Sequence, residues 1–319
     1  MTIKNALILG CYGQDGSLLS KSLLEKGYKI FGITRSLIKN HKNHVSLGIE
    51  NDIEIREGDI TDSKTIRKLI EIQKPSTIYN LAAQSSVGQS FINPTNTIES
   101  IVNGSLNILE IARNIKFDGK IFFAGSSEIF GNTDEAADMN HKQCPNNPYG
   151  IGKQTSLNLV RLYRDIYNIN CMTGILFNHE SPLRNENFVT QKIISEAIKC
   201  TKNKSHTFKL GNIGIARDWG WAEEYVEAMQ LITNSELVND YVICTGKLTT
   251  LKDFAKTTFN LLNLNWENHI IIDERLFRKK DIKRSFGDPS RLSSDLNWKA
   301  TIKVEKIIEK LIDAKNKKK

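Results

Sequence analysis

The sequence predicts an α/β protein in which a doubly wound parallel sheet is followed by a smaller C-terminal α/β region. Over the first half of the chain, short β-branched runs alternate with amphipathic helical stretches. A glycine-rich turn joins the first run to the first helix, and the alternation fades after residue 178. Strands that alternate with helices of this length form parallel sheets with helices on both faces.

The elements follow from these patterns in chain order. The first βαβ unit has a strand over residues 6–9, a helix over residues 16–26 and a second strand over Lys29–Thr34. Helices are predicted after Asp62, after Pro94 and from Tyr149. The remaining strands of the sheet are predicted over Ile53–Glu57, Thr77–Asn80, Lys120–Ala124 and Cys171–Leu176.

The composition is that of an ordinary globular protein, with 319 residues, 39% of them hydrophobic and 25% charged. No apolar run reaches the ~18 residues of a membrane span, and the first residues lack the layout of a secretory signal, so we expect a cytoplasmic protein with no membrane partner. Five scattered cysteines without a CxxC pair argue against disulfides and zinc. His41 and His44 lie in a lysine-rich stretch that we expect to be a solvated loop, and we predict no metal site.

The net charge of +8 fits nucleic acid, an anionic surface or a phosphorylated ligand. Four of the lysines lie at the chain end, at positions 315, 317, 318 and 319, where a solvated terminus is the usual explanation. The basic run over residues 275–284 lacks the interleaved aromatic residues of single-strand binders, so we predict no nucleic-acid partner.

Three glycines, Gly10, Gly13 and Gly16, follow the first predicted strand and lead directly into a helix. Glycine permits a tight turn and lets the backbone approach a pyrophosphate, whose charge is met by free N–H groups at the helix N-terminus. A plain turn is the alternative, because glycines three apart also recur by chance. The position between strand and helix favours a dinucleotide, and with it a Rossmann-type sheet.

Residues at the ends of the next two strands bear on which dinucleotide binds. The second strand ends in Arg35 and Ser36, where an NAD site usually has an acidic residue for the ribose 2′-hydroxyl. A guanidinium and a hydroxyl suit a 2′-phosphate, so NADP is favoured; an exposed arginine at a strand end is the alternative. Asp59, after the third strand, either accepts from the adenine amino group or caps a turn.

These positions suggest a division of the chain. Residues 1–178 are predicted to form the NADP-binding Rossmann domain, to which residues 213–245 return. Residues 179–319 are predicted to form mainly the substrate-binding region, with residues 181–217 covering the substrate.

Tyr149 and Lys153 lie four residues apart at the start of a predicted helix, so their side chains share one face. An ammonium there is expected to lower the pKa of the tyrosine from ~10 toward neutrality and so to provide a phenolate base. Chance produces this spacing too, but of the eight tyrosines only Tyr149 has lysine at +4, and it follows an Asn-Asn-Pro turn.

Ser126 and Glu128 follow the fifth strand, at the sheet edge where open α/β folds bind ligands. Ser126 is placed to hydrogen-bond a hydroxyl that is being oxidised, and Glu128 supplies a carboxylate beside it. A turn cap and a surface charge are the alternatives for these two residues.

Several strings of the sequence together carry a family resemblance. The two most specific are NHESP at residues 178–182 and RDWG at residues 217–220. The sequence resembles the extended short-chain dehydrogenase/reductases and, within them, the GDP-mannose 4,6-dehydratase family. The resemblance runs nearly end to end, through GQDG at 13–16, YNLAAQSS at 79–86, SSE at 126–128, NFVTQKI at 187–193, LGN at 210–212 and Gly-Asp-Pro at 287–289.

The resemblance implies a hydro-lyase that holds and recycles NADP. Tyr149 would be the base that starts hydride transfer from sugar C4, and Lys153 would hold the nicotinamide ribose. Glu128 would remove the C5 proton while water leaves from C6, and the hydride would return to C6. Ser126 stands where the family usually has threonine.

The resemblance also implies two sets of binding residues. The set for NADP is Gly10, Gly13, Gln14, Asp15, Gly16, Arg35, Ser36, Asp59, Ile60, Leu81, Ala83, Tyr149 and Lys153. The set for the GDP-sugar is Ser85, Asn178, Glu180, Val189, Lys192, Arg217 and Arg278.

Departures from the family pattern leave alternatives open. Ser86 replaces a usual histidine, Leu183 replaces a usual arginine, and the loop after the second strand is short. A GDP-heptose or GDP-N-acetylhexosamine dehydratase, a 4-ketosugar reductase and an epimerase are therefore alternatives, as is a non-catalytic NADP-binding or nucleic-acid-binding protein. The resemblance implies a homodimer built on the helices after Pro94 and at Tyr149, with a homotetramer left open.

Overall fold

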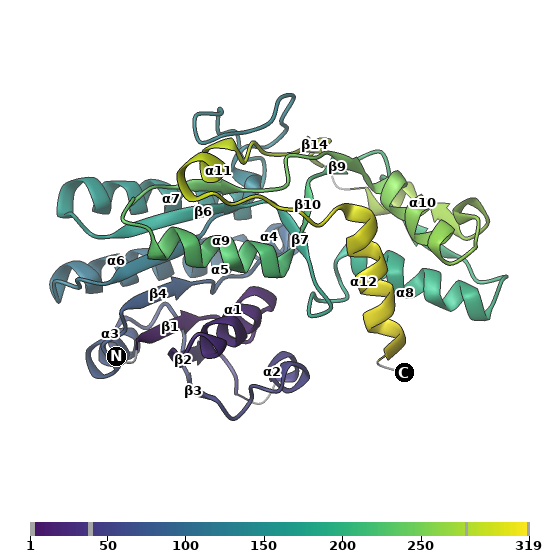
Figure 1. Cartoon of the computed structure of the whole chain (residues 1–319). Helices are drawn as coiled ribbons and strands as arrows, with labels where there is room; N and C mark the ends of the chain where they lie inside the picture. The colour runs from purple at the N-terminus through teal and green to yellow at the C-terminus, as the bar shows by residue number, and fades with distance from the viewer. Residues whose placement is uncertain (1–3, 38–40, 278–279, 318–319) are drawn as a thin grey trace.

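The computed structural model describes residues 4–37, 41–277 and 280–317, and within these ranges seven parallel strands form one sheet in the order β11-β6-β5-β4-β1-β2-β3. Helices cover both faces of this sheet (Figure 1), so the predicted fold class is confirmed. The strands of the sheet are β1 (Asn5–Leu9), β2 (Lys29–Thr34), β3 (Ile53–Glu57), β4 (Thr77–Asn80), β5 (Lys120–Ala124), β6 (Cys171–Leu176) and β11 (Tyr241–Ile243).

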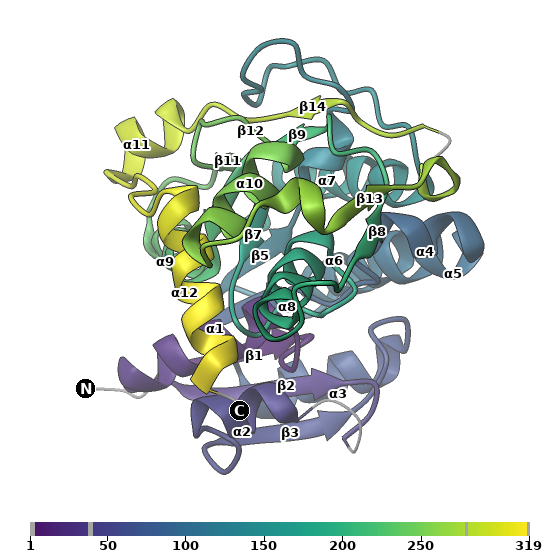
Figure 2. The same cartoon turned by 90° about the vertical axis from the view of Figure 1, so that its right-hand side faces the viewer.

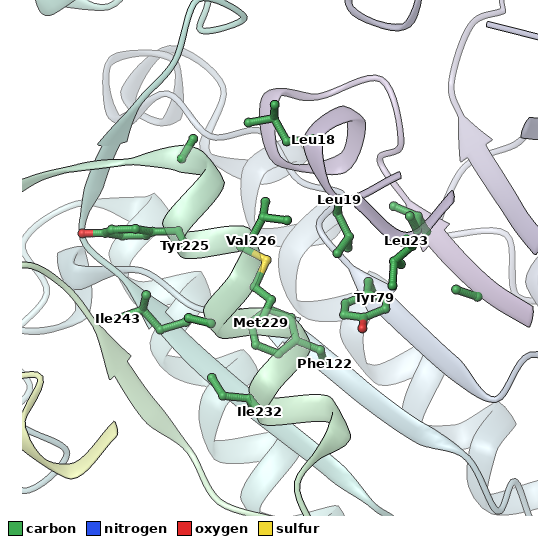
Figure 3. Packing of buried hydrophobic residues seen from close by; sticks show 14 of the residues in the cluster. Leu18, Leu19, Leu23, Tyr79, Phe122, Tyr225, Val226, Met229, Ile232 and Ile243 are labelled. Carbon is green, nitrogen blue, oxygen red and sulfur yellow. The ribbon is translucent and has the colours of Figure 1, made fainter. Parts of the chain in front are cut away.

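The two faces of the sheet are covered by different helices. On one face, α1 (Gln14–Glu25) and α9 (Ala222–Asn234) pack together, and Figure 3 shows Leu19 and Met229 meeting over Tyr79. On the other face lie α3 (Ser63–Gln73), α6 (Gly104–Asn114) and α7 (Pro148–Tyr167). Successive β1 side chains enter alternate cores, as expected for a strand that is buried on both faces.

The helix starts follow from local chemistry. Asp62 caps α3 by accepting from the N–H groups of Lys64 and Thr65. The long helix predicted after Pro94 consists of α5 (Pro94–Ile98), a π-helical turn (Glu99–Asn103) and α6. Helix α1 begins two residues earlier than predicted, inside the glycine-rich turn.

The lysine-rich stretch near residue 44 is not a solvated loop, so that expectation was wrong. It contains a short helix, α2 (Lys42–Leu47), and His44 is fully buried. The His44 Nε2 lies 2.9 Å from the carbonyl oxygen of Cys11, and the imidazole packs edge-on against Tyr12. The histidine therefore supports the backbone of the glycine-rich turn.

A second core lies beyond the carboxyl edge of the sheet. There α8 (Val189–Lys202), α10 (Leu251–Leu261) and α12 (Val304–Lys317) pack around Phe254 and Ile308 (Figure 2). Among the described residues, none of the helices combines the length and the apolar character that crossing a bilayer requires. The remaining elements are α4 (Val87–Ile92), α11 (Ser290–Leu296), β7 (Asn178–Glu180), β8 (Phe208–Leu210), β9 (Ala216–Arg217), β10 (Trp219–Trp221), β12 (Thr249–Thr250), β13 (Ile270–Ile272), β14 (Arg284–Ser285) and the 3₁₀ turns Ser127–Ile129, Trp266–Asn268 and Glu274–Leu276.

A buried carboxylate joins α7 to the edge of the sheet. Asp240, which is 5% exposed, accepts from Arg161 Nε at 3.0 Å, from both terminal nitrogens of Arg164 at 3.0 and 2.9 Å, and from the Thr173 N–H at 2.8 Å. Burial would raise the pKa of Asp240, but the Arg164 guanidinium outweighs burial and holds that pKa below its ordinary value. The ion pair therefore fixes the helix that carries Tyr149.

We expect Asp240→Asn to lower the free energy of unfolding by about 3 kcal/mol, because it leaves two guanidinium groups without their carboxylate. Urea denaturation measures the change. Because the folded pKa is depressed, this stabilisation is present above the unfolded pKa and is lost as the pH falls through the folded value. The difference between the two proteins should therefore shrink in acid.

Glu54→Gln is the matched control, since it breaks the exposed Arg56–Glu54 pair. Exposed pairs contribute about 0–1 kcal/mol, so this variant should unfold nearly as the parent does. Equal losses in the two variants would contradict the role given to Asp240.

Candidate active site

The site lies where the parallel strands end. Leu9 pairs with Asn80, Asn80 pairs with Phe123, and Ala124 pairs with Gly174 along the sheet. The loops that follow β1, β4, β5 and β6 therefore leave the sheet at one edge. This register brings the glycine-rich turn, the segment after Asn80 and the Ser126 turn side by side.

The glycine-rich turn needs its glycines for space and for conformation. Gly10 has φ +83°, and a Cβ there would lie 2.9 Å from the Cα of Ala82. A Cβ on Gly16 would lie 2.4 Å from the carbonyl oxygen of Gly10. Gly13 is the N-cap of α1 and offers no side-chain hydrogen bond to the first turn. The free N–H groups in the first turn of α1, and the absence of side chains that would keep a ligand away from the backbone, fit a pyrophosphate.

The other residues predicted to bind the cofactor follow the neighbouring strands. Arg35 is exposed at the end of β2, and Ser36 beside it is half-buried. Asp59 accepts hydrogen bonds from the N–H of Thr61 at 2.9 Å and from the hydroxyl of Thr61 at 2.8 Å. These two bonds cap a turn, which is the alternative role given for Asp59 above. Ile60 is buried, while Leu81 and Ala83 are half-buried in the segment after β4.

The four predicted catalytic residues converge at the start of α7. Tyr149 is buried in the first helical turn, and the Ser126 side chain lies near enough to its hydroxyl to lower the phenol pKa. Glu128 lies on the 3₁₀ turn after Ser126, and the carbonyl of Glu128 packs against Gly150. The hydroxyl of Tyr149 is near enough to the Glu128 carboxylate for that charge to raise the phenol pKa.

Asn147 holds two of these groups in place. Its Oδ1 accepts from the Gly150 N–H at 2.9 Å, which caps α7. Its Nδ2 donates to Glu128 Oε2 at 2.7 Å. One amide side chain therefore fixes both the start of the helix that carries Tyr149 and the position of the Glu128 carboxylate.

Lys153 lies on the same face of α7 as Tyr149, with Nζ 5.7 Å from the centre of the phenol ring. Its ammonium donates to the carbonyl oxygen of Ala124 at 2.6 Å. Burial lowers the pKa of Lys153 to about 8, because a desolvated ammonium is less stable than the neutral amine. The lysine is thus cationic below that pH.

The pKa of Tyr149 moves in the direction opposite to the one expected from the Tyr/Lys spacing. Burial raises it to about 12, and the hydrogen bond from Ser126 opposes this only in part. The expectation that Lys153 brings this pKa toward neutrality was therefore wrong for the protein as it stands. Desolvation is the largest cause, and the Glu128 and Asp15 charges also raise this pKa, which the spacing alone could not reveal.

The residues predicted to bind the substrate are spread over several elements. Asn178 and Glu180 lie on β7, and burial raises the pKa of Glu180 although Arg184 Nε is 3.3 Å from its carboxylate. The Nζ of Lys192 donates to the Lys209 carbonyl at 2.7 Å, and Arg217 Nη2 lies 3.3 Å from Asp281 Oδ1. These last contacts lie within the C-terminal region. Ser85 is exposed, Val189 begins α8, and Arg278 lies outside the described residues.

Three residues at this edge were not assigned a site role from the sequence. Asn147 was taken only as part of a turn. His179, between Asn178 and Glu180, lies 2.9 Å from the Asp15 carboxylate, and Arg184 donates to the His179 carbonyl at 2.6 Å. The position of His179 within the NHESP string was the available signal, because that string follows strand β6 at the edge of the sheet where the site lies.

Comparison with known proteins gives the family. The sequence model of the family described as "GDP-mannose 4,6 dehydratase" matches residues 7–311. The chain is 37% identical to GDP-mannose 4,6 dehydratase 1 of Arabidopsis thaliana, over 97% of this chain and 89% of that protein. It is 34% identical to the GDP-mannose 4,6 dehydratase of Homo sapiens, over 97% of this chain and 90% of that protein.

Solved structures agree on the fold. The UDP-N-acetylglucosamine 4-epimerase of Methanobrevibacter ruminantium M1 superposes with a TM-score of 0.87 at 21% identity, and each chain is covered over its full length (100%). The dTDP-glucose 4,6-dehydratase of Bacillus anthracis, solved with NAD, has a TM-score of 0.85 at 17% identity and covers 98% of this chain and 97% of its own. At these identities the likeness concerns the fold alone. The family match and the two relatives are specific, and by them this chain belongs to the GDP-mannose 4,6-dehydratase family.

Proposed function

We propose that this protein is a hydro-lyase that converts GDP-mannose to the GDP-4-keto-6-deoxy sugar with internally recycled NADP. Membership of the GDP-mannose 4,6-dehydratase family over nearly the whole chain is the observation that carries this proposal. The convergence of Tyr149, Ser126, Glu128 and Lys153 at one sheet edge supports the roles given to them below.

The glycine-rich turn would hold the cofactor pyrophosphate through the first-turn N–H groups of α1. Arg35 and Ser36, at the end of β2, would contact the 2′-phosphate, and the exposed guanidinium of Arg35 is accessible for that contact. Bound NADP supplies the hydride acceptor and donor, and in its oxidised form it also places a positive charge in the site.

Tyr149 would take the proton from the C4 hydroxyl, and Ser126 would orient that hydroxyl through its hydrogen bond. A buried phenol with a pKa of about 12 stays protonated at neutral pH and cannot accept a proton. The reaction therefore requires a positive charge beside the phenol to stabilise the phenolate. The Lys153 ammonium, cationic below about pH 8, is the charge that α7 itself provides. This ammonium would stabilise the phenolate form of Tyr149 that accepts the proton.

Glu128 would act after C4 has become a ketone. A ketone makes the C5 proton acidic, and Glu128 would remove that proton as the carboxylate and pass it to the hydroxyl that leaves C6, so that water is released and a C5–C6 double bond forms. Asn147 supports this role because its amide holds one carboxylate oxygen at 2.7 Å and so aims the other. A reductase or an epimerase would not need this elimination step.

The GDP portion would be held by residues of the C-terminal region. Asn178, Lys192 and Arg217 supply an amide and two cations, and a diphosphate needs about this many charge-assisted donors. Glu180, Ser85 and Val189 complete the described part of the set predicted to bind the GDP-sugar. Arg278, outside the described residues, stays a predicted contact of the GDP-sugar.

We also propose a cytoplasmic homodimer. Helix α7, one of the two helices predicted for the interface, exposes Ile151, Leu162 and Ile166, and α4, which precedes Pro94, exposes Phe91 and Ile92 beside it. Such a surface on neighbouring helices suits a second copy of the chain. Within the described residues the cysteines are free, as expected in a reducing compartment. Sedimentation at micromolar concentration distinguishes the dimer from a monomer.

Purified protein incubated with GDP-mannose should yield a product lighter by about 18 mass units, the mass of one water. No added NADPH should be consumed, because the hydride returns to the same sugar. Mass spectrometry over a panel of GDP-, UDP-, CDP- and dTDP-sugars measures both the reaction and the substrate class. Stoichiometric NADPH oxidation without loss of water would instead identify a 4-ketosugar reductase.

Glu128→Gln should lower the rate of water loss by about 10²–10⁴-fold, because the amide cannot accept the C5 proton. Oxidation at C4 does not use this carboxylate, so transfer of deuterium from C4-labelled substrate to the cofactor should persist. Glu135→Gln, which changes an exposed glutamate seven residues away in sequence, is the control and should keep full activity. If Glu128→Gln keeps the parental elimination rate, Glu128 is not the base.

A further inference from the structure

His179 has a hydrogen-bond acceptor at each of its two ring nitrogens. Nδ1 lies 2.7 Å from the carbonyl oxygen of Phe177. Nε2 lies 2.9 and 3.0 Å from the two carboxylate oxygens of Asp15. A carbonyl oxygen can only accept, so Nδ1 must carry a proton.

The second nitrogen then decides the charge of the ring. If Nε2 had no proton, its lone pair would face the lone pairs of the Asp15 carboxylate at hydrogen-bond distance. A proton on Nε2 removes this conflict and makes the ring an imidazolium that donates at both ends. In agreement, the charge and hydrogen bond of His179 hold the pKa of Asp15 below its ordinary value, although burial acts to raise that pKa.

Asp15 occupies a position where a negative charge matters. It lies in the first turn of α1, between Gly13 and Gly16 of the glycine-rich turn. A helix N-terminus attracts anions, and an uncompensated carboxylate in the same turn would repel a pyrophosphate. The His179 imidazolium cancels that charge without itself lying on α1.

Three neighbouring hydrogen bonds make this contact part of a wider junction. Gln14 Nε2 donates to the His179 carbonyl at 3.3 Å and to Asp15 Oδ1 at 3.0 Å, and the Ser181 hydroxyl donates to Gln14 Oε1 at 2.8 Å. The QD pair of the glycine-rich turn is thereby joined to the H and S of the NHESP string.

The surroundings of His179 leave it little freedom. Tyr225 of α9 stacks on the imidazole with ring centres 4.6 Å apart, and Gly220 of β10 has no room for a Cβ beside that phenol. The other titratable or charged groups around the pair are Arg184, which donates to the His179 carbonyl; Glu180, which is buried beside Arg184; and Tyr149 of α7.

We propose that His179 is a positioning residue, held as an imidazolium, that neutralises Asp15 and thereby lets the first turn of α1 bind the cofactor pyrophosphate. The pair also ties the cofactor helix to β7, which carries two predicted substrate contacts. This inference rests on the proposed NADP site, and it assigns the roles of His179 and Asp15 as a pair rather than as separate contacts.

A double-mutant cycle tests the neutralisation. His179→Gln should speed the release of NADP from the holoenzyme at least about tenfold, because the Asp15 carboxylate then loses its hydrogen-bonded cation and keeps only Gln14 and the charge of Arg184. Adding Asp15→Asn to His179→Gln removes that charge and should restore release to within about threefold of the parent. Dilution of the holoenzyme followed by separation and ultraviolet absorbance of released nucleotide measures the rates.

The control is His206→Gln, which removes the histidine of a second histidine–carboxylate pair, His206 with Glu196 at 2.6 Å, away from α1. It should not change NADP release. If His179 only packs against Tyr225, Asp15→Asn will fail to rescue the His179→Gln protein, and the proposal is overturned.

Nitrogen-15 spectra of histidine-labelled protein give a second reading that does not depend on cofactor or turnover. The signals absent from His179→Gln belong to His179, and at pH 7 both should have the shift of a protonated ring nitrogen. One unprotonated ring nitrogen would overturn the proposal. If the parent protein binds no NADP and turns over no sugar nucleotide, the proposed function fails, while these spectra still decide the state of the pair.

Discussion

The register of the parallel sheet is the constraint on which the site depends. Because β1, β4, β5 and β6 run in one direction and are paired nearly end to end, their following loops leave at one edge. The glycine-rich turn packs against the segment after β4, and Lys153 reaches back to the last residue of β5. Cofactor residues and catalytic residues that are far apart in sequence become neighbours for this one geometric reason.

The site buries several ionisable groups, and burial disfavours their charged forms. Tyr149 and Lys153 are 8% and 9% exposed, and burial moves both pKa values against the charged form. Glu180 is buried as well, with Arg184 beside it. The apolar cores on the two faces of the sheet and the Asp240 ion pairs hold the fold, so that these groups can stay in place for chemistry.

Much of this arrangement could be predicted from sequence periodicity. The β-branched runs gave the first six strands of the sheet, and the Asn-Asn-Pro turn gave the start of α7, because these signals are local. The short helix α2 and the burial of His44 could not be predicted, since a lysine-rich stretch looks solvated unless its contacts with Cys11 and Tyr12 are known. The same holds for the raised pKa of Tyr149, which depends on desolvation by the folded chain.

In the candidate site, too, local signals could be predicted from the sequence and long-range contacts could not. Ser126, Glu128, Tyr149 and Lys153 were found by spacing and by their place at strand and helix ends. Contacts between segments that are distant in sequence, such as Asp15 with His179 or Asn147 with Glu128, require the fold. Which sugar the C-terminal region accepts depends on side chains from several elements, so no single string of the sequence determines it.

The central claim is that one sheet edge holds a single cofactor which takes a hydride from C4 and returns it to C6 of the same sugar. The most direct measurement mixes two forms of GDP-mannose. One form carries deuterium at C4 and no carbon-13, and the other carries carbon-13 in the ring and no deuterium. The account predicts deuterium at C6 only in molecules without carbon-13. Deuterium in the carbon-13 product, or its loss to free NADPH, would contradict the account.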